Sequence, residues 1–260
     1  MNKSSIAKPQ GEAQNRGEIT QVPLLDLRRQ YEGIRDEILP EIERVCASQQ
    51  FILGSEVEKL ESDIAGFIGC REAVGCASGT DALWLALLAL GVGPGDLVIT
   101  TAFSFFASAS AIVRAGARPI FVDVDPHTLN IDPVSVQNQL QSGAARKLKV
   151  LLPVHLYGQC SDMDSLQALA DAFNLLILED AAQAIGASWR DRRAGSLGNA
   201  AAFSFYPTKN LSAYGDAGLV TTSDSELALH MRRLRNHGSL RRYHHEELGW
   251  NSRLDSLQAA

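Results

Sequence analysis

Between residues 73 and 222 the chain alternates short apolar runs with longer amphipathic stretches, and this rhythm limits its possible folds more than any other feature. The apolar runs have the length and composition of strands and cover residues 73–77, 97–101, 119–124, 149–154, 175–179, 200–206 and 218–222. Helix-like stretches at residues 81–90, 106–115, 132–141 and 163–173 separate most of them. Continuous Val, Ile and Leu runs suit strands buried on both faces, so we predict an α/β fold: a mostly parallel sheet of roughly seven strands with helices on both faces. A loop joins the last two runs, which allows one strand to be antiparallel.

Composition excludes several classes of protein. The 260 residues are 45% apolar, enough for a large core, and the formal charge of −6 argues against binding to nucleic acids or anionic membranes. The four cysteines form no C-x-x-C pair, which favours the reduced cytoplasm over a disulfide framework. The longest apolar run, around residues 82–92, is too short to span a membrane.

Two further helices are expected before the sheet, because apolar residues recur at helical spacing in "LRRQYEGIRDEILPEIERVCAS" and "SEVEKLESDIAGFIG". Residues 1–20 are polar, have no signal-peptide core and are predicted to be a disordered N-terminal extension. At the other end, "WNSRLDSLQAA" has the pattern of an amphipathic helix without a stop signal, so we expect the protein to continue beyond Ala260.

Lys209 in "AAFSFYPTKNLSAYGDAGLVTT" is the first candidate functional residue. A lysine in a loop after a strand is usually only solvated, but this one is surrounded by polar residues: Ser204, Tyr206, Thr208, Asn210 and Ser212. A lysine at the carboxyl edge of an α/β sheet can be desolvated until its amine becomes nucleophilic. This position therefore suggests a lysine that forms a Schiff base.

Two other segments carry candidate binding groups. In "LLILEDAAQAIGA", Asp180 ends a buried strand, where a carboxylate needs either a turn to cap or a cation to pair with, such as a protonated pyridine nitrogen. In "CASGTDALWLALLALG", Ser78, Gly79 and Thr80 lie between a strand and a helix, which suits an ordinary helix cap or an anion site.

These segments, together with "GWNSRLDSLQAA", follow the order and spacing of the DegT/StrS family of pyridoxal phosphate-dependent sugar aminotransferases, which the chain resembles from about residue 22 to residue 260. Near the N-terminus, "PLLDLRRQY" and "FILGSEVEKLE" are similar to the family as well. The resemblance implies the large domain of aminotransferase fold type I at residues 71–245, after an N-terminal helical arm at 21–70. Residues 246–260 are then the start of a truncated C-terminal small domain. The chain departs from the family in "TTAFSFF", which lacks a usual proline, and at Asp216, where Glu is common.

The resemblance also implies roles for individual residues. Lys209 holds pyridoxal phosphate as a Schiff base, Asp180 pairs with its pyridine nitrogen, and Gln183 lies near its ring oxygen. The phosphate is expected at Gly79, Thr80, Asp81 and Ser204. Phe105 is expected to stack on the ring, with a place in the core as the alternative. Asn251 matches an asparagine that reaches the phosphate of a partner subunit, which implies a homodimer with shared active sites.

The implied reaction is transfer of an amino group from an amino acid, with glutamate as the family's usual donor, to a keto group of a nucleotide-linked sugar for polysaccharide or secondary-metabolite synthesis. Lys209 argues against the dehydratase branch of the family, which has histidine there. Another fold type I enzyme and an inactive or regulatory fragment remain as alternatives.

The basic run from Arg232 to Arg242 is interpreted either as a solvated helix face plus loop or as a binding site for the substrate's diphosphate. No metal site is predicted, since the adjacent His244 and His245 cannot converge on one ion.

Overall fold

The computed structural model describes residue 22, residues 24–142 and residues 147–260. The predicted N-terminal extension, residues 1–20, lies outside the described residues.

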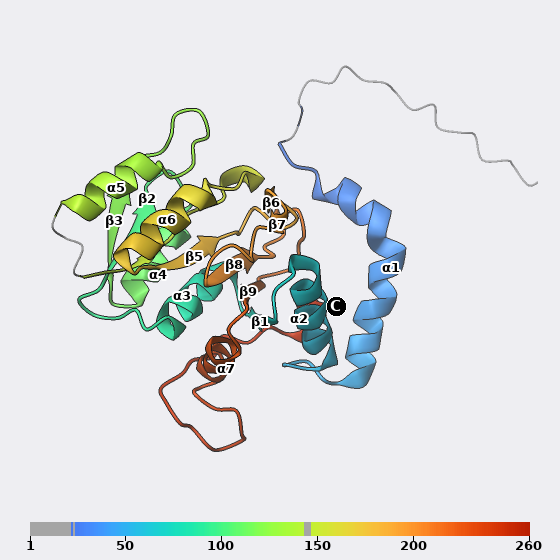
Figure 1. Cartoon of the computed structure of the whole chain (residues 1–260). Helices are drawn as coiled ribbons and strands as arrows, with labels where there is room; N and C mark the ends of the chain where they lie inside the picture. The colour runs from blue at the N-terminus through green and yellow to red at the C-terminus, as the bar shows by residue number, and fades with distance from the viewer. Residues whose placement is uncertain (1–21, 23, 143–146) are drawn as a thin grey trace, which may run out of the picture.

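A seven-stranded sheet forms the centre of the molecule, with the strand order β1-β9-β8-β5-β4-β2-β3 (Figure 1). The strands are β1 (Glu72–Cys76), β2 (Leu97–Thr101), β3 (Arg118–Val122), β4 (Leu148–Leu151), β5 (Leu176–Asp180), β8 (Ala200–Ser204) and β9 (Gly218–Thr222). β9 is antiparallel to both of its neighbours, whereas β3, β2, β4, β5 and β8 pair in parallel. The predicted, mostly parallel sheet is confirmed, and the strand entered through a loop is the antiparallel one.

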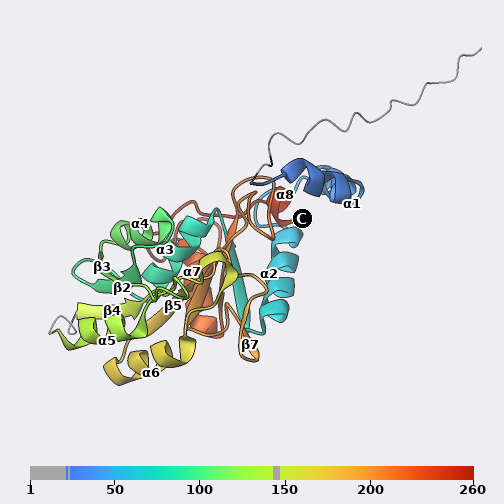
Figure 2. The same ribbon diagram turned by 90° about the horizontal axis from the view of Figure 1, so that it is seen from above.

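Helices cover both faces of this sheet (Figure 2). On one face lie α3 (Gly79–Ala89), α4 (Phe106–Arg114) and α7 (Ser225–Leu234), and on the other lie α2 (Ser55–Ile68), α5 (Pro133–Gln141) and α6 (Met163–Phe173). Each face has its own apolar core, because successive strand residues point to opposite sides: Phe203 packs with one set of helices and Ala202 with the other. The helices on both faces are therefore confirmed.

Aspartates explain where three of these helices begin. Asp132, Asp162 and Asp224 each precede a helix and accept backbone N–H bonds from its first turn. At β4 the prediction was three residues too long, since the strand ends at Leu151 and not at residue 154. The physical reason is Pro153, which has no N–H for the ladder.

The C-terminal end of the chain lies beside the first two helices. α1 (Leu27–Ser48) stands away from the sheet, and the C-terminus lies next to α1 and α2 (Figures 1 and 2). The helix predicted for "WNSRLDSLQAA" is wrong for residues 250–255, because only α8 (Ser256–Ala259) is helical. The N–H groups of Trp250 and Ser252 donate to the carbonyls of Leu234 and Arg235, at 2.8 and 3.0 Å, and Asp255 then caps α8.

Three short elements were not predicted. They are the 3-10 turn η2 (Leu156–Gly158) and the hairpin strands β6 (Ser188–Trp189) and β7 (Arg192–Arg193). Segments of two or three residues are too short to show a periodicity in the sequence.

Candidate active site

Asp180 and Lys209 lie at the carboxyl edge of the sheet. β5 ends at Asp180, and the parallel neighbour β8 ends at Ser204, shortly before Lys209. In open α/β sheets, ligands bind just beyond the carboxyl ends of the parallel strands. Two elements that are separate in the sequence therefore bring a carboxylate and an amine to the position where a ligand is expected.

The Asp180 carboxylate is buried and hydrogen-bonded. Ser108 Oγ, in α4, donates to Asp180 Oδ2 at 2.7 Å, and the Ala182 backbone N–H donates to Oδ1 at 3.2 Å. Burial raises the pKa of Asp180, because the charged form loses its hydration. The two hydrogen bonds, together with His155 and Lys209, oppose that rise. Burial thus disfavours the ionised form of Asp180, and a cation placed beside the carboxylate would stabilise that form.

Lys209 is half-buried in the loop between β8 and β9, where its backbone N–H donates to the Tyr206 carbonyl at 2.8 Å. Burial lowers the pKa of its amine, and the charge of Asp180 partly opposes that effect. A lowered pKa increases the fraction of uncharged, nucleophilic amine. Partial burial thus distinguishes Lys209 from a fully solvated loop lysine, and its role as the Schiff-base lysine stays a prediction.

The turn between β1 and α3 packs against the end of β8. Ser78 caps α3, since its Oγ accepts the Asp81 N–H at 3.1 Å. A Cβ added to Gly79 would lie 2.5 Å from Ser204 Cβ, and one added to Gly218 would lie 2.3 Å from the Ser78 carbonyl, so both positions require glycine. The first turn of α3, whose N–H groups lack helical partners, therefore lies beside the Ser204 hydroxyl.

Thr80 and Asp81 follow Gly79 in this first turn. Both carboxylate oxygens of Asp81 already have partners within the chain. Asp81 Oδ1 pairs with Arg114 of α4, and Oδ2 accepts the Ser252 hydroxyl at 2.8 Å. The Arg114 guanidinium also lies 3.5 Å from the centre of the Trp84 ring. The carboxylate of Asp81 thus ties α3, α4 and the segment around Ser252 together.

Gln183 and Phe105 flank the Asp180 end of the site. Gln183 Oε1 accepts the Tyr157 N–H at 2.8 Å, which leaves its Nε2 group as the end that donates. Phe105 directly precedes α4, one turn before Ser108, and its side chain is 77% exposed. Such exposure rules out the core alternative for Phe105.

Asn251 contributes no contact to Asp180 or Lys209 within the described residues. It is exposed, pairs with Asn236 in an isolated bridge, and accepts a hydrogen bond from Arg253 Nε at 3.1 Å. Its role at the phosphate of a partner subunit stays a prediction.

The basic run divides into a structural part and an exposed part. Arg232 pairs with Glu72 at 3.0 Å, Arg233 with Glu247 at 2.9 Å, and the buried Arg235 with Glu61 at 2.5 Å. The interpretation as a solvated helix face is therefore wrong for Arg235, which lies in the interior. Arg241 and Arg242 are exposed on the loop that extends below α7 in Figure 1.

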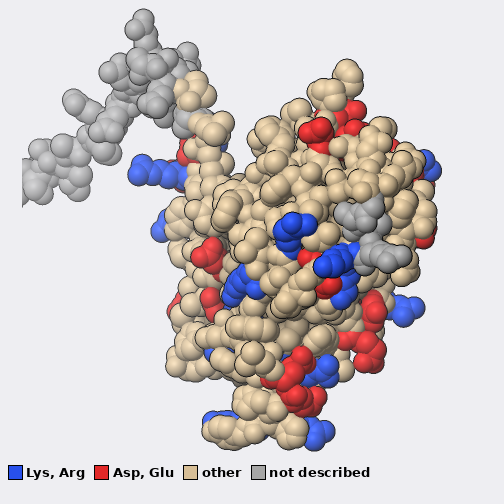
Figure 3. Space-filling view, turned by 90° about the vertical axis from the view of Figure 1, so that its left-hand side faces the viewer, with Lys and Arg blue, Asp and Glu red and all other residues tan. Residues whose placement is uncertain are grey.

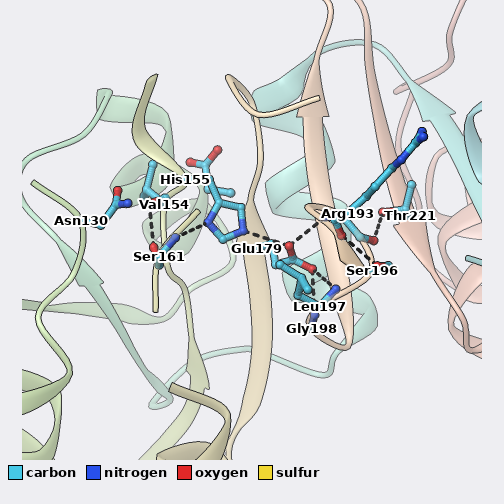
Figure 4. Close-up of polar contacts among 12 residues, drawn as sticks. Asn130, Val154, His155, Ser161, Glu179, Arg193, Ser196, Leu197, Gly198 and Thr221 are labelled. Carbon is cyan, nitrogen blue, oxygen red and sulfur yellow. Dashed lines mark hydrogen bonds and ion pairs between the residues drawn. The ribbon is translucent and has the colours of Figure 1, made fainter. Parts of the chain in front are cut away.

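The sequence analysis missed a buried pair of His155 and Glu179, which lies next to Asp180 in the sequence (Figure 4). Ser161 N–H donates to His155 Nδ1 at 3.1 Å, so the ring proton lies on Nε2, which donates to Glu179 Oε2 at 2.9 Å. Glu179 also accepts the N–H groups of Gly195, Leu197 and Gly198, each at 2.8 Å. The backbone N–H of His155 donates to the backbone carbonyl of Asp180 at 3.0 Å. The His155–Glu179 pair therefore fixes the end of β5. The signal was "VHLYG", a histidine directly after a strand-like run.

Among the described helices, none combines the length and apolar character needed to cross a membrane. On the face in Figure 3, positive and negative side chains both occur and much of the surface is neutral.

The chain is similar to proteins of one family. The model of the DegT/DnrJ/EryC1/StrS aminotransferase family matches residues 32–260. A protein of Geobacillus stearothermophilus named pleiotropic regulatory protein is 53% identical over 92% of this chain and 63% of the relative. UDP-2-acetamido-2-deoxy-3-oxo-D-glucuronate aminotransferase of Pseudomonas aeruginosa is 45% identical over 92% of this chain and 66% of the relative.

The fold is also that of solved structures. The crystal structure of S. venezuelae DesV in complex with a ketimine intermediate superposes with a TM-score of 0.88 at 48% identity, covering 92% of this chain and 63% of that one. The chain thus spans less than two thirds of the length of these relatives. From the family model, the shared fold and the matching motifs, the chain belongs to the DegT/DnrJ/EryC1/StrS aminotransferase family.

Proposed function

We propose that this chain is the cofactor-binding part of a pyridoxal phosphate-dependent aminotransferase. The enzyme transfers an amino group from an amino acid, expected to be glutamate, to a keto group of a nucleotide-linked sugar used in polysaccharide or secondary-metabolite synthesis. Relatives named as UDP- and dTDP-sugar aminotransferases support the substrate class.

The observation that carries the proposal is the coupling of Asp180 and Lys209 at one edge of the sheet. Each residue has its pKa shifted by burial in the direction that disfavours its charged form, and each lowers that penalty for the other. Perturbed pairs of this kind concentrate at functional sites. An aldehyde cofactor with a protonated ring nitrogen would use both: the amine as its covalent anchor and the carboxylate as its counter-ion.

The rest of the site also fits pyridoxal phosphate. The close packing of Gly79 on Ser204 supports a phosphate site, because it joins free N–H groups of a helix start to a hydroxyl. Ser204 Oγ accepts the Tyr206 N–H at 3.3 Å, and its own hydrogen can still donate to a phosphate. Gln183 presents Nε2 for a ring oxygen, and Phe105 is exposed for stacking.

The positions of these residues indicate what each would do in the reaction. When bound, pyridoxal phosphate supplies an electron sink for the charge released at the donor's α-carbon. Asp180, held by Ser108 and Ala182, keeps a negative charge at the ring nitrogen. Lys209 Nζ, with its lowered pKa, accepts and returns a proton. The first turn of α3 and Ser204 orient the phosphate, and Phe105 shields one face from water.

The homodimer with shared active sites belongs to this proposal, as does the cytoplasmic location predicted from the sequence. Asn251 is exposed, as a residue that reaches a partner's phosphate must be. The exposed Arg241 and Arg242 are the members of the basic run left for the substrate's diphosphate.

A regulatory function is the second candidate, since the Geobacillus relative carries a regulatory name. Lys209 and Asp180 favour the enzyme, because a scaffold that only binds partners has no need of a desolvated amine beside a buried carboxylate.

The proposal is tested by incubating the full-length protein, of which this chain is the proposed cofactor-binding part, with pyridoxal phosphate, glutamate and a panel of nucleotide-linked keto-sugars, with amine formation followed by mass spectrometry. We expect an amino-sugar with the natural sequence and none with Lys209→Ala. Cofactor binding without amine formation from any keto-sugar would favour the regulatory candidate.

A further inference from the structure

We propose that Ser108 is a positioning residue that holds the Asp180 carboxylate ionised and aimed at the cofactor site, with Ser104 supporting it from the surface. The inference rests on the proposed function, because it assigns Ser108 a part in cofactor binding.

The geometry gives Ser108 no other task. Its side chain is fully buried on the inner side of α4, and its Oγ lies 2.7 Å from Asp180 Oδ2, across a sequence separation of 72 residues. The carboxylate can only accept, so the serine hydroxyl is the donor. This bond occupies Oδ2 and leaves Asp180 with a fixed orientation at the carboxyl end of β5.

Ser104 extends the arrangement toward the surface. Its Oγ lies 3.0 Å from Ser108 Oγ. Because the Ser108 hydrogen is used on Asp180, Ser104 must donate to Ser108. Hydrogen bonds in a chain polarise and strengthen one another. The Ser104–Ser108–Asp180 relay thus connects the loop that carries Phe105 to the buried carboxylate.

Asp180 needs this help because burial acts against its charge. The titratable groups that act on it from other elements are His155, which follows β4, and Lys209, in the loop after β8. His155 donates its ring proton to Glu179, and the charge of Lys209 favours the ionised form of Asp180 less than the Ser108 hydrogen bond does. Donation from Ser108 is the largest effect that favours the ionised form. Without it, Asp180 would bind a proton at a higher pH.

The test compares Ser108→Ala with Ser108→Thr, which keeps the hydroxyl, and with Ser104→Ala. The matched control is Ser110→Ala, on the same helix, because Ser110 Oγ only donates to the Ala107 carbonyl at 3.3 Å. Two quantities are measured: the titration of the Asp180 carboxyl in cofactor-free protein by carbon-13 NMR, assigned with Asp180→Asn, and the dissociation constant of pyridoxal phosphate from about pH 5.5 to about pH 9.

We expect Ser108→Ala to titrate at higher pH than the natural protein and to bind the cofactor roughly 10-fold more weakly near neutral pH. The deficit should narrow toward alkaline pH, where the carboxylate is ionised without help. Ser104→Ala should show a smaller change in the same direction, while Ser108→Thr and Ser110→Ala should behave as the natural protein does.

An unchanged Asp180 titration in both Ser108→Ala and Ser104→Ala would overturn the inference, and so would a loss of affinity that is equal at every pH. Failure of the natural protein to bind pyridoxal phosphate would instead overturn the proposed function. The NMR titration requires no cofactor, so it separates the two failures and decides whether Ser108 governs the carboxylate.

Discussion

Asp180→Asn should weaken cofactor binding while leaving the cofactor-free protein at least as stable as before. The substitution keeps the shape of the side chain and an oxygen for Ser108 or Ala182 to bind, but it removes the buried charge. A raised pKa in the folded state means that the stability due to Asp180 is present at low pH and is lost as pH rises through that pKa. Above that pKa the ionised carboxylate therefore costs stability, and the neutral amide removes that cost.

When the cofactor is bound, Asp180→Asn has the opposite effect and destabilises the complex. An asparagine leaves the protonated ring nitrogen without its counter-ion in a buried site, and a broken buried ion pair costs about 3–5 kcal/mol. That range corresponds to a loss of roughly two to four orders of magnitude in affinity. Pyridoxal phosphate binding is measured by equilibrium dialysis, and stability of the cofactor-free protein by urea unfolding.

Asp171→Asn is the matched control for this change, because it removes the same charge from an exposed position on α6. It should change neither quantity. The reasoning is refuted if Asp180→Asn binds the cofactor as tightly as the natural protein does, or if it destabilises the cofactor-free protein by several kcal/mol.

Two further substitutions test the framework around the site. Gly79→Ala places a Cβ 2.5 Å from Ser204 Cβ, so we expect a loss of about 1–3 kcal/mol in stability and weaker phosphate-dependent cofactor binding; binding of pyridoxal phosphate equal to that of the natural protein would contradict the close packing. Glu61→Gln leaves the buried Arg235 without its carboxylate and should lower the free energy of unfolding by about 3 kcal/mol in urea. Glu41→Gln, which breaks an exposed pair with Arg44, should cost less than about 1 kcal/mol, and equal losses in the two variants would refute the distinction.

Much of the fold could be predicted because its signals are local. A strand buried on both faces, such as β5 with "LILED", begins with a continuous apolar run, here Leu176 to Leu178, and helix starts are marked by capping aspartates such as Asp162. The antiparallel direction of β9 followed from a connection that lacks a helix. The segment at residues 250–255 could not be predicted, because its hydrogen bonds go to Leu234 and Arg235, which no local pattern reveals.

The candidate site divides in the same way. Asp180 ends one strand and Lys209 lies in the loop after another, so their place at the sheet edge was visible in the sequence. Ser108 and His155 were not singled out, because their partners, Asp180 and Glu179, lie on other elements. Ser108 carries no local signal, and the place of His155 after a strand-like run does not identify Glu179 as its partner. The diphosphate interpretation of the basic run did not anticipate that Arg235 forms a buried ion pair with Glu61, because Glu61 is distant in the sequence, in α2.

The covalent attachment of the cofactor at Lys209 is the most direct test of the whole account. The protein is incubated with pyridoxal phosphate, reduced with borohydride and digested, and the pyridoxyl group is located by mass spectrometry. We predict a single modified lysine, Lys209, because burial makes its amine nucleophilic beside Asp180. Lys149 bonds to the Gly91 carbonyl and lies 3.3 Å from Asp96, before the amino end of β2, and so cannot take its place. An adduct on Lys149 or Lys147, with Lys209 unmodified, would contradict the account.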